Sequence, residues 1–178
     1  MGEHTFKDKR LAYENSMRVP MIIRYPKSFK AKSVISEQCL NIDVAPTILD
    51  IAGIEKPDYM QGESMLNLLV GKSDFDWRES FLFEYYKDSE WPHAGPNQVA
   101  VRTVEFKLVE SFVKNDIDEL YDLVNDPGEM HNLINDPRFD KKENELRLES
   151  LRLQQKYKYN PDRDWHLRTI VKNRKFNN

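Results

Sequence analysis

The sequence predicts an α+β fold, in which the tail end of an α/β layer is followed by a small antiparallel sheet packed with a C-terminal helix. We place the first part in residues 1–72 and the second in residues 73–178. Three patterns predict this order: an apolar strand before a capped helix, then segments with alternating apolar residues, then a long polar helix. With 178 residues, 39% of them hydrophobic, the chain is long enough for one or two domains.

The first part contains one expected strand and two expected helices. Val19 to Tyr25 reads as a buried strand bounded by prolines. A helix is expected over Val44 to Ala52, with Asp43 as its N-cap and Gly53 as its C-terminal stop. A shorter helix is expected to begin at a serine cap and to cover 64–69.

The second part reads as strands followed by a helix. The segment 81–85 alternates in the manner of a strand, and 99–103 with 106–112 form an expected hairpin joined by two residues. A further strand is expected over 119–123, before a turn, and a polar helix over 141–156. The residues expected along the buried side of that helix are Leu146, Leu148, Leu151 and Leu153.

Charge and apolar patterning exclude several kinds of partner. The formal net charge of -3 gives no case for a nucleic-acid partner, which would need a concentrated basic patch. Apolar runs such as Val19 to Ile23 are far shorter than the roughly 20 residues that span a membrane. The opening residues lack the pattern of a secretory signal. The acidic series from Asp116 to Asp126 lacks the glycine and glutamate of an EF-hand loop, so we predict no metal site.

Several separated blocks resemble the type I sulfatases, in the order in which that family has them. The first is Gly2-Glu3-His4 followed by Lys-x-x-x-Tyr-Glu-x-x-x-Arg-x-Pro over 9–20. The others are the Asp-Val-Ala-Pro-Thr segment over 43–54, the Arg-Thr-x-x-Phe-Lys hairpin over 101–108 and the Glu-Leu-Tyr-Asp-Leu segment over 119–133. The resemblance implies the end of an alkaline-phosphatase-like catalytic domain followed by the sulfatase C-terminal subdomain.

The resemblance assigns the sulfate-contacting lysine of the family to Lys9. An ammonium suits that role, because it can stabilise the negative charge that grows on sulfate oxygens. The neighbouring Lys7 has no such motif around it and is expected to face solvent. His4 is a second catalytic candidate, as a hydrogen-bond donor or general acid; the alternative is a loop histidine that orients the turn before Lys9.

Two further residues are candidates for substrate binding. His93 lies in a predicted loop between strands, and such loops often recognise substrates; the alternative is an ordinary surface loop. Arg102 could contact an anionic substrate, although a strand arginine paired with Glu84 or Glu105 is the simpler expectation. Glu14 and Arg18 are four residues apart, so a helix would pair them.

The resemblance also says what this sequence lacks. Type I sulfatases use a formylglycine nucleophile beside a calcium ion, and both belong upstream of the first block. Cys39 is followed by Leu-Asn-Ile, so it does not match the Cys-x-Pro-x-Arg motif of formylglycine. We therefore expect no cofactor on this fragment and no activity from it alone. The expected partners are a sulfated carbohydrate or aryl sulfate, and either the missing N-terminal catalytic part or a second copy.

Two other readings stay open at this stage. One is a noncatalytic sulfatase-derived module that binds sulfated glycans. The other is part of another alkaline-phosphatase-superfamily enzyme, such as a phosphodiester or phosphonate hydrolase. The compartment stays unknown, although intact relatives of this kind are usually periplasmic, secreted or lysosomal.

Overall fold

The structure is a computed structural model that describes residues 11–86, 98–111 and 117–160. Its contacts divide the chain into two compact units. One unit is Val19–Phe81, and the other combines the described residues before Val19 with those from Leu82 onward. The boundary predicted between residues 72 and 73 stays a prediction about independently folding domains.

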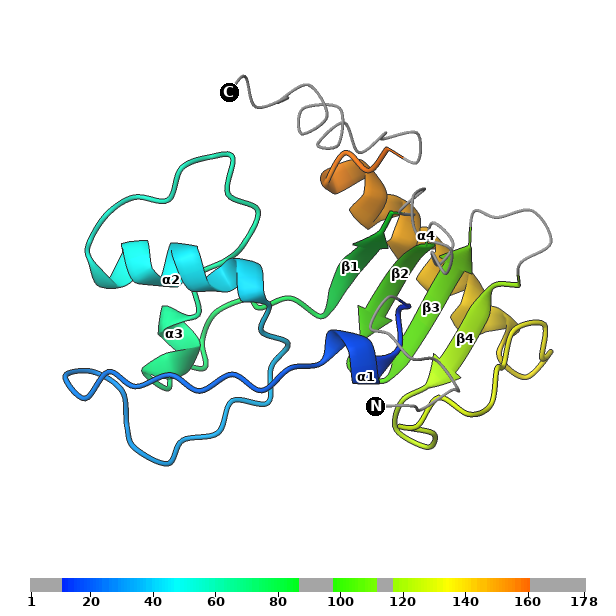
Figure 1. Cartoon of the computed structure of the whole chain (residues 1–178), viewed down its shortest axis with the longest axis horizontal. Coiled ribbons are helices and arrows are strands. Elements are labelled where there is room, and N and C mark those ends of the chain that lie inside the picture. Colours follow the sequence, from blue (N-terminus) through cyan, green and yellow to red (C-terminus); the bar gives the residue numbers. More distant parts are fainter. Residues whose placement is uncertain (1–10, 87–97, 112–116, 161–178) are drawn as a thin grey trace, which may run out of the picture. The chain divides into compact units, whose positions relative to one another are not determined.

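The second unit is built on a four-stranded sheet with the strand order β1-β2-β3-β4. The strands are β1 (Ser80–Tyr85), β2 (Gln98–Thr103), β3 (Phe106–Ser111) and β4 (Glu119–Asp122), and successive strands run in opposite directions (Figure 1). The predicted hairpin is confirmed: β2 and β3 pair antiparallel, with Val101 opposite Leu108. The predicted α+β class and the predicted C-terminal helix, α4 (Asp140–Lys156), are confirmed as well.

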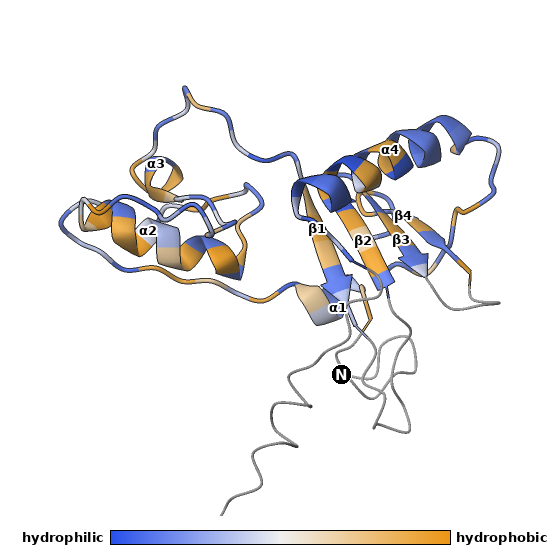
Figure 2. Ribbon diagram, turned by 90° about the horizontal axis from the view of Figure 1, so that it is seen from above, coloured by the Kyte–Doolittle hydropathy of each residue, from blue (hydrophilic) through white to orange (hydrophobic). Residues whose placement is uncertain are grey.

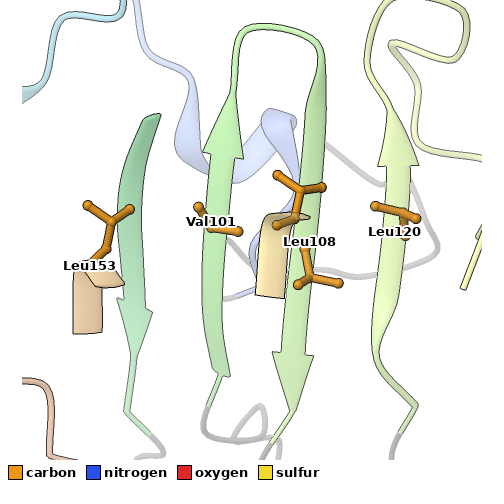
Figure 3. Packing of buried hydrophobic residues seen from close by; sticks show 5 residues of the cluster. Val101, Leu108, Leu120 and Leu153 are labelled. Atoms are coloured by element: carbon orange, nitrogen blue, oxygen red, sulfur yellow. The ribbon is translucent and has the colours of Figure 1, made fainter. Parts of the chain in front are cut away.

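Helix α4 packs on one face of this sheet and closes the main core. Figure 3 shows side chains of this cluster on β2, β3, β4 and α4. Its buried members are Val101, Leu108, Leu120, Leu146 and Leu153. The prediction for α4 was partly wrong, because Leu148 and Leu151 are 69% and 54% exposed. The buried stripe is instead Leu146, Ser150 and Leu153, at the i, i+4, i+7 spacing of one helix face.

The opposite face of the sheet receives the segment that precedes Val19. Successive side chains of a strand point to opposite faces, so Ala100 and Val109 lie on the face away from Val101 and Leu108. Ala12 packs against both of them and is 2% exposed. The short helix α1 (Glu14–Met17) follows directly, and Figures 1 and 2 show α1 and α4 on opposite sides of the sheet.

The unit Val19–Phe81 contains the helices that the sequence predicted. After the 3₁₀ turn η2 (Asn41–Asp43) comes α2 (Val44–Ile51), and Gly53, at φ +69°, follows its C-terminal end. The shorter helix α3 (Leu66–Leu69) begins where Ser64 Oγ accepts a hydrogen bond from the Leu66 amide at 3.1 Å.

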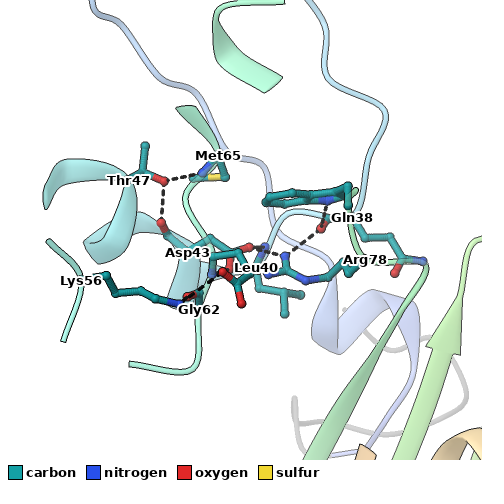
Figure 4. Close-up of polar contacts among 10 residues, drawn as sticks. Gln38, Leu40, Asp43, Thr47, Lys56, Gly62, Met65 and Arg78 are labelled. Atoms are coloured by element: carbon teal, nitrogen blue, oxygen red, sulfur yellow. Dashed lines mark hydrogen bonds and ion pairs between the residues drawn. The ribbon is translucent and has the colours of Figure 1, made fainter. Parts of the chain in front are cut away.

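Asp43 is the N-cap residue of α2, as predicted, but its side chain makes no capping hydrogen bond to the helix. Its carboxylate is fully buried and pairs with the Arg78 guanidinium, with Nη2 2.7 Å from Oδ1 (Figure 4). The same carboxylate accepts the backbone N–H groups of Leu40 at 2.7 Å and Glu63 at 2.9 Å. A buried carboxylate needs such partners, and these donors are stronger than an α2 amide alone.

The predicted buried strand over Val19–Tyr25 is wrong. The described residues place this segment in no sheet, and Ile22 is 95% exposed while Val19 is 60% exposed. A strand forms only beside another strand, because its backbone N–H and C=O groups need partners across a ladder. The segment therefore has the composition of a buried strand, but none of the described residues covers it.

Gly62 should be the least replaceable glycine of this unit. A Cβ there would lie 2.1 Å from the carbonyl oxygen of Ile42, and that backbone cannot move without disturbing Asp43. We expect Gly62→Ala to destabilise the chain by about 3 kcal/mol, the upper range for overpacking. At Gly53 the space is open and only the positive φ opposes a side chain, so Gly53→Ala should cost about 1 kcal/mol.

Thermal unfolding followed by circular dichroism checks this difference between the two variants. Equal losses of stability in the two variants would contradict the predicted backbone clash.

Candidate functional site

Most of the predicted site residues cannot be placed. Lys9, His4 and His93 lie outside the residues that the structure describes. Arg102 is described, and it lies on β2, on the sheet face that receives the segment before Val19. The described part of the candidate site consists of the residues from Leu11 to Arg18 and of their contacts with this face.

Arg102 binds a carboxylate from that segment. Its Nη2 lies 3.2 Å from Oε2 of Glu14, and its Nε lies 3.4 Å from Oε1. The expected partners Glu84 and Glu105 were wrong, since contacts across the fold cannot be read from distance along the chain. The expected pairing of Glu14 with Arg18 was wrong too, because α1 ends at Met17 and leaves Arg18 extended.

Lys107 is the second cation of this cluster and is fully buried. It is the cross-strand partner of Arg102 in the β2–β3 hairpin, so both side chains leave the same face. Its Nζ lies 3.4 Å from Oε1 of Glu14 and forms an ion pair with Glu129, which is 2% exposed. Glu129 also accepts the backbone N–H of Glu14, at 2.7 Å from nitrogen to Oε2.

The cluster combines two cations, Arg102 and Lys107, with two carboxylates, and the cations favour the ionised form of Glu14. Burial by itself would raise the pKa of the Glu14 carboxyl, but the hydrogen bond from Arg102 and the charge of Lys107 outweigh it. The net effect lowers the pKa of Glu14 below its usual value. Glu14 is therefore ionised at neutral pH, as an anion shared between two cations.

Tyr121 of β4 and Tyr13, which immediately precedes α1, extend the cluster. The Tyr121 hydroxyl donates to Glu119 at 3.0 Å, and the Tyr13 hydroxyl contacts the other oxygen of that carboxylate at 3.4 Å. Burial and then the nearby Glu119 charge raise the pKa of both phenols, so both stay neutral donors. The residue before Glu14 is thus also tied to the sheet.

The sequence reasoning assigned no role to Lys107 or Glu129, although both lie in blocks that resemble the sulfatases. For Lys107 a signal existed, because strand alternation places it on the same face as Arg102 and Val109. For Glu129 the signal was weaker: it follows the Asn-Asp-Pro-Gly turn, and a turn glutamate is usually solvated. Only the structure shows that this turn directs Glu129 into the protein.

Within the described residues, no three His, Cys, Asp or Glu side chains gather as metal ligands. This part of the chain therefore offers no fit for the calcium ion that the family resemblance implies. None of the helices that the structure describes is long and apolar enough to cross a membrane.

Comparison with known families now adds to this geometry. Residues 2–156 match the family model described as N-sulphoglucosamine sulphohydrolase, C-terminal. The chain belongs to the sulfatase family. The match covers the Lys9 motif as well as α4, so both units of this chain correspond to the C-terminal part of a sulfatase.

Two of the curated relatives are named as sulfatases of N-acetylglucosamine. An N-acetylglucosamine-6-O-sulfatase of Bacteroides thetaiotaomicron is 43% identical over 169 residues, which are 91% of this chain and 29% of that protein. Human N-acetylglucosamine-6-sulfatase is 42% identical over 79 residues, which are 44% of this chain and 14% of that protein. The chain thus spans less than a third of the length of these relatives.

Solved structures agree with this family. One similar protein was solved in complex with its substrate D-glucosamine-2-N,6-O-disulfate. The two structures superpose with a TM-score of 0.84 and 39% sequence identity, and the match covers 92% of this chain and 33% of that protein. A phosphonate monoester hydrolase from Silicibacter pomeroyi has a TM-score of 0.55 and 27% identity, and covers 65% of this chain and 24% of that chain. The alkaline-phosphatase-like scaffold is shared by both kinds of enzyme.

The Glu14 cluster predicts a pH-dependent stability. Because the folded-state pKa of Glu14 is lowered, its contribution is present above about pH 4.3 and is lost as the pH falls through the folded value. Glu14→Gln should therefore destabilise the chain by about 3 kcal/mol at pH 7, as expected for breaking a buried ion pair. The difference in stability between the variant and the wild type should shrink as the pH falls through the folded-state pKa of Glu14.

Urea unfolding at pH 7 and at pH 3 checks this prediction. Glu145→Gln is the matched control, because the exposed Glu145 pairs with Lys142 at the surface and should change stability little at either pH. A loss that is as large at pH 3 as at pH 7 would contradict the assigned ion pairs of Glu14.

Proposed function

We propose that this chain is the C-terminal part of an enzyme that hydrolyses sulfate esters of amino sugars. The observation that carries the proposal is the likeness, over nine tenths of the chain, to an N-acetylglucosamine-6-O-sulfatase. The substrate-bound structure with a TM-score of 0.84 supports the same class, since its substrate is a sulfated glucosamine. The substrate proposed here is therefore a sulfated amino sugar, with simple aryl sulfates as poorer substrates.

Lys9 is proposed as the residue that contacts the sulfate group. Cleavage of a sulfate ester increases negative charge on the sulfate oxygens and on the leaving oxygen. An ammonium held beside these oxygens stabilises the transition state more than the ground state, and this difference accelerates the reaction. The motif over 9–20, which the family match includes, supports this role.

The other predicted residues receive narrower roles. His4 is proposed to donate a hydrogen bond or a proton next to Lys9. His93, which lies in the sequence between β1 and β2, is proposed to select the sugar. For Arg102, contact with an anionic substrate stays a prediction, and its guanidinium already has Glu14 as a partner.

The nucleophile and the metal are proposed to come from an upstream catalytic part. Formylglycine would supply the nucleophile and calcium would hold the sulfate, as the sulfatase resemblance implies. The described residues hold no metal cluster, so we propose no step that this chain performs through calcium. By itself the chain is proposed to lack turnover, because a single ammonium cannot replace a nucleophile.

The phosphonate hydrolase reading is less well supported than the sulfatase reading. The TM-score is 0.55 for the phosphonate monoester hydrolase and 0.84 for the protein bound to a sulfated glucosamine. A noncatalytic glycan-binding module would keep Lys9 and lack an upstream formylglycine motif. The sequence upstream of the first residue therefore distinguishes that alternative.

The apolar segment after Arg18 is proposed to be covered by the upstream catalytic part. Val19 and Ile22 are largely exposed, and Ile48 of α2, in the same unit, is 60% exposed. Val19 and Ile22 are three positions apart, and exposed apolar side chains gathered in one segment are typical of an interaction surface. The related structure extends well beyond the third that this chain covers, which supplies enough protein to bury them.

Removing the Lys9 ammonium tests the proposed function. In the chain joined to its catalytic part, Lys9→Ala should lower kcat and kcat/KM together by about a hundredfold to a thousandfold, as for loss of one fixed transition-state donor. Lys7→Ala is the matched control and should stay near wild type. Steady-state kinetics on a glucosamine 6-sulfate and on an aryl sulfate measure both effects, and equally mild losses at the two lysines would refute the assignment.

The exposed apolar segment predicts self-association of the isolated chain. Sedimentation velocity should show oligomers, because extended apolar backbone without a sheet neighbour pairs with other copies. Ile22→Lys should shift the distribution towards monomer by placing a charge in the contact, whereas Leu148→Lys on the outer face of α4 should not. A monodisperse wild-type monomer would contradict the proposed surface.

A further inference from the structure

The sheet face opposite α4 carries a buried four-membered charge cluster. Arg102 and Lys107 are cross-strand neighbours there, and Lys107 is fully buried. Removing a cation from water is costly unless anions pair with it inside the protein. The two anions, Glu14 and Glu129, both come from outside the sheet, so the cluster joins parts of the chain that are far apart in sequence.

Glu14 is held in this cluster at two places. Its side chain contacts Lys107 at 3.4 Å and Arg102 at 3.2 Å, and its backbone N–H donates to Glu129 at 2.7 Å. A side-chain contact alone would let the backbone rotate. Adding the backbone contact fixes the direction in which the chain enters α1.

Glu129 reaches this position at a conformational cost. Its φ is +55°, in the left-handed region where residues other than glycine, asparagine and aspartate are uncommon. Gly128 precedes it in the turn, so the sequence places a side chain at the left-handed position next to a glycine. Such an outlier persists where the surroundings require the side chain, here for both Lys107 and the Glu14 amide.

We propose that Lys107 and Glu129 are positioning residues for Lys9. They act through Glu14, which follows Lys9 by five positions in the sequence. The inference rests on the proposed sulfate contact of Lys9. The buried charges of the C-terminal sheet fix one end of the segment that carries the catalytic ammonium.

A purely structural role gives a different expectation. Buried ion pairs are often no more stabilising than apolar side chains of the same size, so stability alone is a weak reason for this arrangement. If the cluster positions Lys9, loosening it should weaken the transition-state contact in the folded enzyme, in addition to lowering the stability of the sheet unit. A misplacement of about 1 Å can lower a rate about a hundredfold, which makes the effect measurable.

The first test uses the full 178-residue chain and needs no activity. In Lys107→Met, site-resolved hydrogen exchange of the Glu14 amide should accelerate about tenfold or more, since its charged acceptor loses its counterion. The amides of Val101 and Leu108 report the loss of stability of the sheet, and the Glu14 amide should accelerate by a larger factor than they do. Arg147→Met is the matched control, because it breaks ion pairs with Asp118 and Glu143 on the α4 side and should leave the Glu14 amide protected.

The second test is a double-mutant cycle in the chain joined to its catalytic part. Lys107→Met should lower kcat about tenfold to a hundredfold with little change in KM, and Lys9→Ala in that background should cost much less than it does alone. Arg147→Met should show no such coupling. Glu129→Gln, which keeps the size of the side chain, should give a smaller effect of the same kind.

These outcomes separate this inference from the proposed function. If Lys9→Ala is harmless by itself, the proposed function fails, and hydrogen exchange still decides whether the cluster holds the segment. If Lys9→Ala is severe while the two substitutions combine additively, or if the Glu14 amide stays protected in Lys107→Met, the positioning role is overturned.

Discussion

The buried ammonium of Lys107 is the constraint on which the sheet unit depends. A charge without contact with water requires anions within the protein, and no neighbouring residue of β3 supplies one on that face. The anions come from the segment before Val19 and from the turn after β4. One charge in the middle of the sheet therefore fixes three pieces of the chain, and apolar contacts such as Ala12 on Ala100 and Val109 complete the packing.

The unit Val19–Phe81 uses the opposite charge in the same way. There the buried group is the Asp43 carboxylate, and Arg78, from beyond α3, neutralises it. The carboxylate also accepts two backbone N–H groups, one of them from Glu63, immediately after Gly62. Gly62 packs so closely on Ile42 that the loop and the start of α2 form a single packed structure. In both units, one buried charge and its partners connect segments that are far apart in the sequence.

The sequence was a good guide to elements and a poor guide to partners. Strands β2 and β3 and helix α2 were predicted because their signals are local: alternation, caps and a glycine stop. The partners of Arg102 and Asp43 were not, since ion pairs across the fold depend on topology. The Val19–Tyr25 segment shows a second limit. Its apolar composition predicts a buried strand, but the described residues include no strand or helix that covers it. Lys9 was identified only through the family motif, because spacing alone cannot distinguish it from Lys7.

The two faces of the sheet differ in the side chains that they bury. The α4 face buries the main apolar core, which includes Leu108 and Leu153. On the other face, the central positions are occupied by Arg102 and Lys107, where apolar residues would pack at least as well. This choice is understandable if the face must hold a chain segment in one orientation, because ion pairs and hydrogen bonds are directional whereas apolar contacts are not. The directional contacts of this face therefore fit the proposed role of holding the segment before α1, which none of the apolar contacts on the α4 face would provide.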